Sequence, residues 1–394
     1  MNKIFFIIAL AISTLQFSCK QESRIEPIQR EIVIHHYTEP DSIKNLEARE
    51  DSIEMAITLA KNKKFQNRVW AFAETDPVNS EIGEDAADDP AIWVNKYAPE
   101  RSLVIGTQKK AGLYVYDLNG ETKQFLPVGS INNVDLRDGF MFENREVCLV
   151  AGSNRSLNTI SLFYIDPEKA VLSDSIANIK SDVDEVYGIC MYRSTKTRKF
   201  FVMVNGKGGE IEQWEISSDN SIIKAKMVRE FTVESQPEGM VADDVAGTIY
   251  LGVEEKGICK INAEPDYPVE PIWIESSFGI NQYIDYDIEG LTIYNGTEKK
   301  YLLASIQGNF SYAVWEIGKD GTETYITSFV IWETNNFIDG VEETDGLDVV
   351  SVSLNKQYQK GLLVVQDGFN FESDTLSNQN FKYISWNLVD VFLK

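Results

Sequence analysis

An acidic stretch, DAADDPAIW at 85–93, places three carboxylates within five positions of a chain whose formal net charge is already −24. Further carboxylates precede short apolar runs much later in the chain, at Glu238, Glu289 and Asp345. Two unit charges 4 Å apart interact by about 4 kcal/mol at an effective dielectric constant near 20, so clustered carboxylates must be protonated, hydrated or neutralised by cations. If the fold gathers these residues, they predict a cation site.

The available ligands indicate which cation such a site would prefer. The only two histidines, His35 and His36, lie in a charged N-terminal segment well before the acidic stretch. Oxygen ligands from separate parts of the chain suit calcium, which accepts about six to eight oxygens in flexible geometry, and magnesium is the second choice. Zinc prefers His or Cys ligands. The lack of an imidazole also argues against serine–histidine or phosphohistidine mechanisms in the main domain.

Basic residues follow apolar runs at three places in the same part of the chain. Lys109 and Lys110 lie in GTQKKAGLYVY, Arg155 in AGSNRSLNT and Lys207 in VNGKGGEIEQ. One lysine in a turn is ordinarily solvated surface, but basic residues after equivalent strands of successive units favour a shared rim. Together with a metal they would form a positive bowl for phosphate, in which Arg155 is a planar fork and the lysines are point charges.

The elements that must position these residues are strands. From Ala73 onward, Val-, Ile-, Tyr- and Phe-rich runs such as 102–108, 199–206, 300–309 and 361–368 alternate with Gly, Asn and Asp turns. A polar-then-apolar signature recurs about every 50 residues. It occurs at Asp89-Pro-Ala-Ile, Asp135-Leu-Arg, Tyr187-Gly-Ile, Glu238-Gly-Met, Glu289-Gly-Leu and Asp345-Gly-Leu.

Six such units, each long enough for four short strands, predict an all-β fold: a six-bladed β-propeller over residues 73–394. The first strand of each blade lines the central channel, so equivalent positions converge at one rim. We therefore expect Asp88 or Asp89 to meet Glu238, Glu289 and Asp345 there.

The N-terminus differs from the rest of the chain. Lys3 precedes an apolar run, Ile4 to Phe17, which is shorter than the roughly 20 residues of a membrane span and is typical of a signal peptide over residues 1–18. Cys19 follows directly, as in the lipobox of bacterial lipoproteins. Residues 19–72 are predicted to form a tether, with one amphipathic helix within 41–62, where apolar residues recur at roughly helical spacing. We expect an exported protein that is lipid-anchored through Cys19 to a bacterial envelope membrane; simple secretion is the alternative.

Composition narrows the possible partners. The acidic balance argues against nucleic acid, which requires a basic face, and against docking on anionic lipid through charge. The remaining cysteines, Cys148, Cys190 and Cys259, lie in apolar contexts without a CxxC pair and are predicted to be buried free thiols. A monomer is expected.

From about Ala73 to its end, the chain resembles the β-propeller phytases, the calcium-dependent alkaline phytases of Bacillus type. The matching motifs include DAADDPAIW (85–93), KKAGLYVYDLNG (109–120), GKGGEIEQWE (206–215), DIEGLTIY (287–294), LLASIQGN (302–309) and NQNFK (378–382). The resemblance implies a 3-phytase-type hydrolase of the phosphate monoesters of myo-inositol hexakisphosphate and lower inositol phosphates. It further implies several calcium ions and direct attack of a metal-bound water on phosphorus.

The resemblance also implies roles for individual residues. The calcium ligands around the cleavage site would be Asp88, Glu238, Glu254, Asp287, Glu289 and Gln307. Structural calcium would be held by Asp89 and Asp339, with Glu74 as a further ligand. The phosphate being cleaved would contact Lys109, Arg155 and Tyr187, and a neighbouring phosphate would contact Lys110 and Lys207. Glu238, which would touch both metal and water, is the favoured general base.

Two other functions compete with this interpretation. A calcium-dependent propeller hydrolase of the lactonase type would also place carboxylates in the channel, but it would have little use for Lys109, Arg155 and Lys207 together. A non-catalytic surface propeller that captures phosphorylated or sugar ligands would bind without turnover. Release of phosphate, opening of a lactone or stoichiometric binding distinguishes the three.

Overall fold

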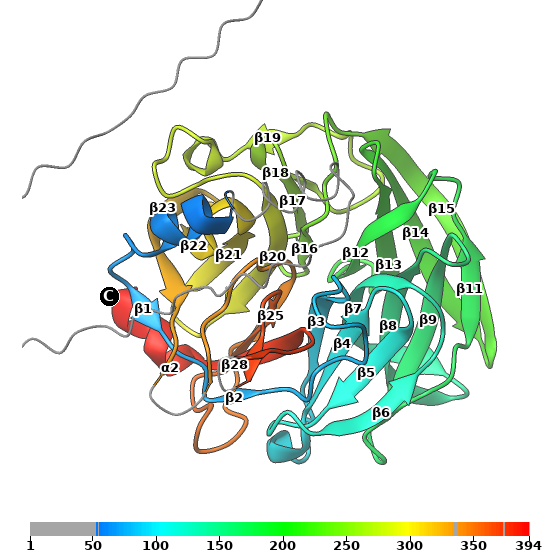
Figure 1. The fold of residues 1–394 in the computed structure, drawn as a ribbon. Helices are drawn as coiled ribbons and strands as arrows, with labels where there is room; N and C mark the ends of the chain where they lie inside the picture. The colour runs from blue at the N-terminus through cyan, green and yellow to red at the C-terminus, as the bar shows by residue number, and fades with distance from the viewer. Residues whose placement is uncertain (1–52, 54, 335–337, 373–374, 394) are drawn as a thin grey trace, which may run out of the picture. The chain divides into compact units, whose positions relative to one another are not determined.

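Each repeat unit forms its own sheet of short antiparallel strands, and the six sheets are arranged around a ring (Figure 1). The computed structural model describes residue 53 and residues 55–334, 338–372 and 375–393. The predicted signal peptide, Cys19 and most of the predicted tether lie outside the described residues. The prediction of a six-bladed propeller of four-stranded blades is confirmed.

Three blades come from the first half of the domain. Blade 1 is β3 (Ala87–Trp93), β4 (Leu103–Gln108), β5 (Gly112–Tyr116) and β6 (Thr122–Leu126). Blade 2 is β7 (Ile131–Phe142), β8 (Arg145–Asn154) and β9 (Thr159–Asp166), with β10 (Val171–Leu172) and β11 (Ala177–Lys180) both paired to β9. Blade 3 is β12 (Val186–Arg193), β13 (Phe200–Gly206), β14 (Glu210–Asp219) and β15 (Ile222–Thr232).

The second half supplies the other three. Blade 4 is β16 (Met240–Asp243), β17 (Thr248–Val253), β18 (Gly257–Asn262) and β19 (Ile272–Trp273). Blade 5 is β20 (Ile288–Asn295), β21 (Lys300–Ile306), β22 (Ser311–Ile317) and β23 (Glu323–Ile331), joined by β1 (Arg68–Val69). Blade 6 is β24 (Leu347–Val350), β25 (Leu362–Asp367), β28 (Asn380–Ser385) and β2 (Ala73–Glu74).

Short elements complete the fold. A hairpin of β26 (Phe371–Glu372) and β27 (Thr375–Leu376) leaves blade 6 between β25 and β28, and the C-terminus carries helix α2 (Trp386–Val389). The 3₁₀ turns are η1 (Pro99–Arg101), η2 (Glu275–Ser277), η3 (Gln307–Asn309) and η4 (Asp390–Phe392). No helix among the described residues is long and apolar enough to cross a membrane.

The core is divided among the blade junctions. The middle strands β4, β13 and β25 are buried along their whole length because neighbouring blades cover both faces. Six apolar clusters result, one between each pair of adjacent blades. Cys148, Cys190 and Cys259 lie in these clusters as buried free thiols, as predicted. The junctions fix the angle between blades and so fix the central channel.

The N-terminal segment closes the ring. β2 pairs antiparallel with β28, in the register Ala73 with Tyr383 and Glu74 with Lys382, and so becomes the outermost strand of the last blade. β1 pairs parallel with β23 in blade 5. Residues 55–62 are helical, and the Asn62 amide donates hydrogen bonds to carbonyl groups of blade 5. Residues before position 73 therefore also contribute to the propeller.

Candidate active site

The first strands of four blades carry a bulge at the same place. The register of pairing shifts between Ala87 and Pro90, Ile131 and Val134, Val186 and Ile189, and Ile288 and Leu291. Each shift leaves two residues outside the ladder and re-aims the first of them. These first residues are Asp88, Asn132, Tyr187 and Glu289, and Glu238 and Asp345 occupy the same place just before the first strands of blades 4 and 6.

Small residues follow the bulge residue where blades come closest. A Cβ on Gly188 would lie 2.3 Å from the carbonyl oxygen of Glu238, and one on Gly239 would lie 2.3 Å from that of Glu289. Real Cβ atoms do not approach backbone oxygens so closely, which is why the recurring signature has glycine at this position. Because these glycines lack a Cβ, the backbone of one blade can lie directly against the backbone of the site residue in the next blade.

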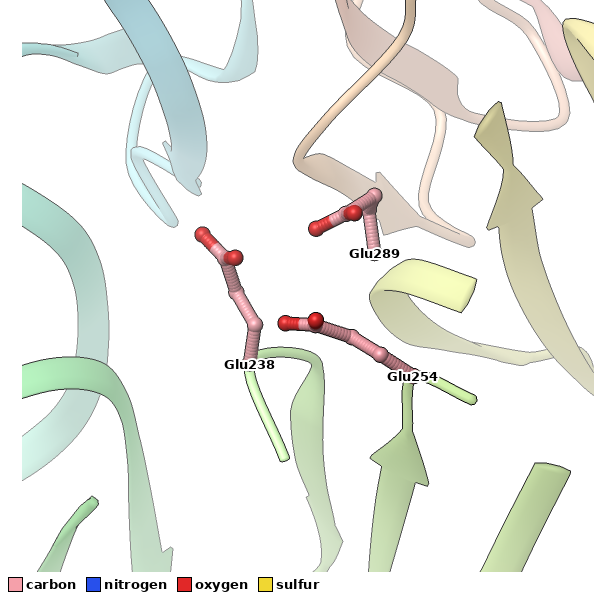
Figure 2. Close-up of side chains that lie close together, drawn as sticks. All are labelled: Glu238, Glu254 and Glu289. Atoms are coloured by element: carbon pink, nitrogen blue, oxygen red, sulfur yellow. The ribbon is translucent and has the colours of Figure 1, made fainter. Parts of the chain in front are cut away.

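Most of the bulge residues line one cavity of about 210 Å³. Its walls are Asp85, Asp88, Lys109, Tyr187, Gln236, Glu238, Glu254, Glu289, Gln307, Glu343, Asp345 and Gln379. The structure therefore brings together residues predicted from five different blades. Figure 2 shows three of their carboxyl groups, those of Glu238, Glu254 and Glu289, directed into the same space. These three offer one oxygen each within 4.8 Å of one another.

Burial of so many carboxylates dominates the electrostatics. Burial, followed by repulsion from neighbouring carboxylates, raises the pKa values of Glu238 and Glu289 well above their ordinary range. The pKa of Asp345 is likewise raised well above its usual value by burial, although Lys109 opposes the shift. Burial also raises the pKa of Glu254, to about 7. Without a cation, these groups therefore resist ionisation near neutral pH.

Lys109 is the basic residue inside the cavity. Its ammonium group lies 2.7 Å from Asp85, 3.1 Å from Asp88 and 3.5 Å from Asp345. Burial alone would lower the pKa of Lys109, but these carboxylates outweigh it, so the pKa lies above its ordinary value and the side chain stays charged. Asp88, which is 1% exposed, keeps one oxygen, Oδ1, without a hydrogen-bond partner among the described residues.

A second basic group surrounds Tyr187. The Arg155 guanidinium lies over the Tyr187 ring, 5.4 Å from its centroid, and the Lys207 ammonium lies 4.6 Å from the same centroid. Arg155 donates hydrogen bonds to Glu185 and, at 3.3 Å, to the side-chain oxygen of Asn132. The Asn132 amide in turn donates to Glu238 at 3.1 Å, so Asn132 joins the basic group to the acidic cavity.

Two of the remaining predicted residues lie near this cavity but do not line it. Asp287 is close enough to raise the pKa of Glu254, although its own side chain is absent from the cavity wall. Lys110 forms an exposed ion pair with Glu84 at 2.6 Å.

The structure separates Asp89 from Asp88. Asp89 lines a second cavity of about 360 Å³, together with Asp135, Arg137 and Asp348, and it accepts a hydrogen bond from the Val134 amide at 3.0 Å. The recurring signature aligned Asp89 of blade 1 and Asp135 of blade 2 with Tyr187 and Glu238. This alignment was therefore wrong by one position in blade 1 and by three positions in blade 2. The signature failed there because glycine follows the site residue in blades 3 to 6, whereas Asp89 and Asn133 follow it in blades 1 and 2. Asp88 and Asn132 take the place instead.

Asp339 lies in blade 6, in an environment different from that of Asp89. It forms an ion pair with Lys382, a side chain that is fully buried and also pairs with Glu74 and, at 3.2 Å, with Asp367. Glu74 belongs to the closing strand β2, so this ionic cluster joins the first and last parts of the propeller. The structure therefore brings Glu74 and Asp339 together and leaves Asp89 in the channel.

Some residues that line the cavity or contact its carboxylates were not predicted as site residues from the sequence. Asn132 and Gln236 are neutral and lack a charge that would mark them, yet both donate hydrogen bonds to Glu238. Asp85 and Asp345 were visible in the acidic stretch and the repeat, but no ligand role was assigned to them. Comparison of the six signatures, residue by residue, would have pointed to Asn132, since it stands where the other blades carry Asp, Glu or Tyr.

The donor set fits a hard cation. Glu238, Glu254 and Glu289 converge, and the buried Oδ1 of Asp88 lacks a hydrogen-bond partner within the described ranges, as expected of a ligand atom that an ion completes. Gln307 lines the same cavity, and its amide donates a hydrogen bond to Asp345 at 2.8 Å. Carboxylate and amide oxygens in irregular geometry match calcium better than they match zinc.

A six-bladed propeller with a carboxylate-rich channel site and adjoining basic residues is the arrangement of a propeller hydrolase. The family model described as Phytase matches residues 48–393, and the chain belongs to the phytase family. The chain is 43% identical over 335 residues to a 3-phytase of Bacillus subtilis (strain 168). The aligned region covers 83% of this chain and 86% of that protein. A solved protein from Lactobacillus plantarum shares 10% identity, covers 74% of this chain and 87% of its own, and has a TM-score of 0.45, too low a likeness to carry an argument.

Proposed function

We propose that this protein is a calcium-dependent phytase that releases phosphate from myo-inositol hexakisphosphate and lower inositol phosphates. The observation that carries the proposal is the meeting of opposite charges at one end of the channel. Glu238, Glu254 and Glu289 converge there, and Lys109 and Arg155 lie beside them. Family membership and the Bacillus 3-phytase relative support the same activity.

The acidic wall alone would repel such a substrate. A phosphomonoester carries about −1.5 to −2 charges at pH 7. When bound by Asp88, Glu238, Glu254, Glu289 and Gln307, calcium would supply positive charge that offsets the carboxylates and the charge on the phosphoryl oxygens. Neither the lactonase reading nor simple ligand capture explains why the basic residues adjoin this particular set of oxygens.

The chain's own residues supply binding and proton transfer. Lys109 is held at the cavity wall by three carboxylates, and we assign it, with Arg155 and Tyr187, to the phosphate being cleaved. Arg155 presents a planar fork that suits phosphoryl oxygens. Lys207 and Lys110 lie farther out and are assigned to a neighbouring phosphate.

Glu238 is assigned as the general base. It is buried, and its two oxygens accept hydrogen bonds from Asn132 at 3.1 Å and Gln236 at 3.3 Å, which fix the direction of the carboxyl group. Burial raises its pKa, and a base whose pKa approaches the working pH accepts a proton more readily from a water molecule that attacks phosphorus.

The decisive experiment measures inorganic phosphate released from inositol hexakisphosphate, with calcium and with EGTA. We expect release with calcium, loss of release in EGTA, and recovery when calcium is restored. Full activity at saturating EGTA would contradict calcium dependence. Lactone opening without phosphate release would favour the rival hydrolase.

We also propose that the protein is exported, anchored through a lipid on Cys19, and monomeric. Support comes from the apolar run before Cys19 in the sequence. Metabolic labelling with a palmitate analogue tests the anchor: wild type should be labelled and Cys19→Ala should not. Light scattering of the purified domain tests the monomer.

A further inference from the structure

Glu185 occupies the centre of the basic group that the proposed function assigns to phosphate. One carboxylate oxygen, Oε1, lies 2.7 Å from Nε of Arg155 and 2.6 Å from its Nη2. The same oxygen lies 3.8 Å from Nζ of Lys207. Both cations also lie over the Tyr187 ring. A single anionic oxygen thus accepts a hydrogen bond from Arg155 and forms an ion pair with Lys207, the two residues that the proposed function assigns to phosphates.

The position of this oxygen resembles that of a phosphoryl oxygen. Guanidinium and ammonium groups bind carboxylate and phosphate through the same charge-assisted hydrogen bonds, so the two anions compete for them. The side chain of Glu185 is 40% exposed and can move into solvent. Arg155 would keep its contacts with Asn132 and Tyr187 when Glu185 leaves, so the fork would remain in place for the substrate.

We propose that Glu185 is a built-in competitor of phosphate for Arg155 and Lys207. It leaves the two cations when a phosphoryl group binds and returns to them as inorganic phosphate departs. The inference rests on the proposed function, because that function assigns Arg155 to the phosphate that is cleaved and released and Lys207 to a neighbouring phosphate.

The consequence is weaker retention of the product. A doubly charged phosphate held by metal, Lys109 and Arg155 together would dissociate slowly, and product release limits turnover in many enzymes. An internal carboxylate that pairs again with Arg155 and Lys207 lowers the affinity of these two side chains for inorganic phosphate. Glu185 therefore acts on product release and requires no part in the chemical step.

The test compares the full chain with Glu185→Gln by calorimetric titration of inorganic phosphate into calcium-loaded protein, below the concentration at which calcium phosphate precipitates. Glutamine keeps a carbonyl acceptor for Arg155 but removes the charge. We expect the Kd for phosphate to fall on the order of 3- to 5-fold, the range of a partly exposed ion pair. Phosphate should then inhibit turnover at correspondingly lower concentration.

The matched control is Glu215→Gln. Glu215 lies on β14 of the same blade and pairs with exposed Lys199 at 2.9 Å, so the variant removes the same unit charge from another ion pair. We expect its phosphate Kd to equal that of the wild type. An equal fall in both variants would show a general charge effect and overturn the proposal.

The other outcomes are equally distinct. A higher Kd in Glu185→Gln would show that Glu185 only positions Arg155, and an unchanged Kd would show no competition; either result overturns the inference. If Glu185→Gln does not fold, Glu185→Asp, which draws the carboxylate back, should shift the Kd in the same direction. Absence of phosphate release by wild type would instead refute the proposed function, and the calorimetric comparison would still decide whether Glu185 competes for anions.

Discussion

At the scale of single residues, Glu238 illustrates how position determines role. It follows Pro237 and precedes Gly239, an unremarkable setting in sequence, yet its carboxyl group is buried between Asn132 of blade 2 and Gln236 of its own blade. The two amides hold both oxygens, so the group cannot rotate freely. The convergence of Glu254 and Glu289 on the same space makes Glu238 a shared ligand and proton acceptor in our proposal.

Replacement of Glu238 by glutamine tests this role. We expect the rate of phosphate release to fall by about 10²- to 10⁴-fold, the usual contribution of a positioned general base. The fold should be retained because glutamine has nearly the same shape and relieves repulsion in the acidic wall. Steady-state kinetics and the melting temperature measure the two effects, and wild-type turnover would contradict the assignment.

Asn132→Leu tests the residue that joins the two halves of the site. The change leaves an oxygen of Glu238 and Nη1 of Arg155 without their amide partner. We expect kcat/KM to fall by about 10- to 100-fold, since misplacement of a reacting group by a fraction of an ångström has costs of this order. Because a structural role alone would lower only the melting temperature, an unchanged kcat/KM in a folded variant would overturn the positioning role.

At the scale of elements, the bulge at the start of the first strand in four blades places much of the site. In an unbroken strand, the side chains of Asp88 and Asp89 would alternate between the two faces of the sheet. The bulge in β3 leaves both residues outside the ladder and re-aims them, and they line two separate cavities. The glycine after the bulge residue then allows the next blade to approach.

Gly239→Ala tests this close approach. The new Cβ would lie 2.3 Å from the Glu289 carbonyl oxygen, so β16 or β20 must shift. We expect a melting temperature several degrees lower, consistent with about 1–3 kcal/mol of overpacking, together with reduced phosphate release. Gly279→Ala is the control, because its nearest neighbour would be the Tyr286 ring at 3.4 Å, an ordinary contact. Equal melting temperatures for both variants would show that the close approach of the blades at Gly239 does not require glycine.

The sequence allowed the blades, the acidic set and the basic set to be predicted, because strand patterns and repeat spacing reflect local physics. It did not allow the exact equivalence of blades 1 and 2 to be predicted, since Asp89 and Asn133 stand where the other four blades carry the glycine that marks the position. Asn132 and Gln236 remained hidden because a neutral amide that hydrogen-bonds to a carboxylate leaves no charge signal in the sequence. Asp339 was expected to hold metal, and no sequence pattern indicated that Lys382 would lie against it.

At the scale of the whole molecule, buried acidity links stability to pH. Burial raises the pKa of Glu254 to about 7 and raises those of Glu238, Glu289 and Asp345 well above their ordinary values. A carboxyl group whose pKa is higher in the folded state than in the unfolded state stabilises the fold at low pH and loses that contribution as pH rises through the folded pKa. The native state binds the extra protons in this window.

We therefore expect the melting temperature of the protein in EDTA to fall as pH rises from about 5 to about 8, on the basis of these raised pKa values. Saturating calcium should raise the melting temperature most at the upper end of this range, because the ion binds the ionised carboxylates. Scanning calorimetry at a series of pH values measures both effects. A melting temperature that rises with pH in EDTA would contradict the assignment of these groups as buried acids.

The pairing of β2 with β28 has a consequence for biosynthesis. β2 emerges early from the ribosome, yet its strand partner β28 belongs to the last stretch of the chain to be translated. Five blades can form before β28 is translated, but β2 can complete blade 6 and close the ring only when translation has nearly ended. A premature stop codon before Asn380 would therefore leave β2 without this partner, although β1 could still pair with β23, and the ring would stay open for proteases to recognise.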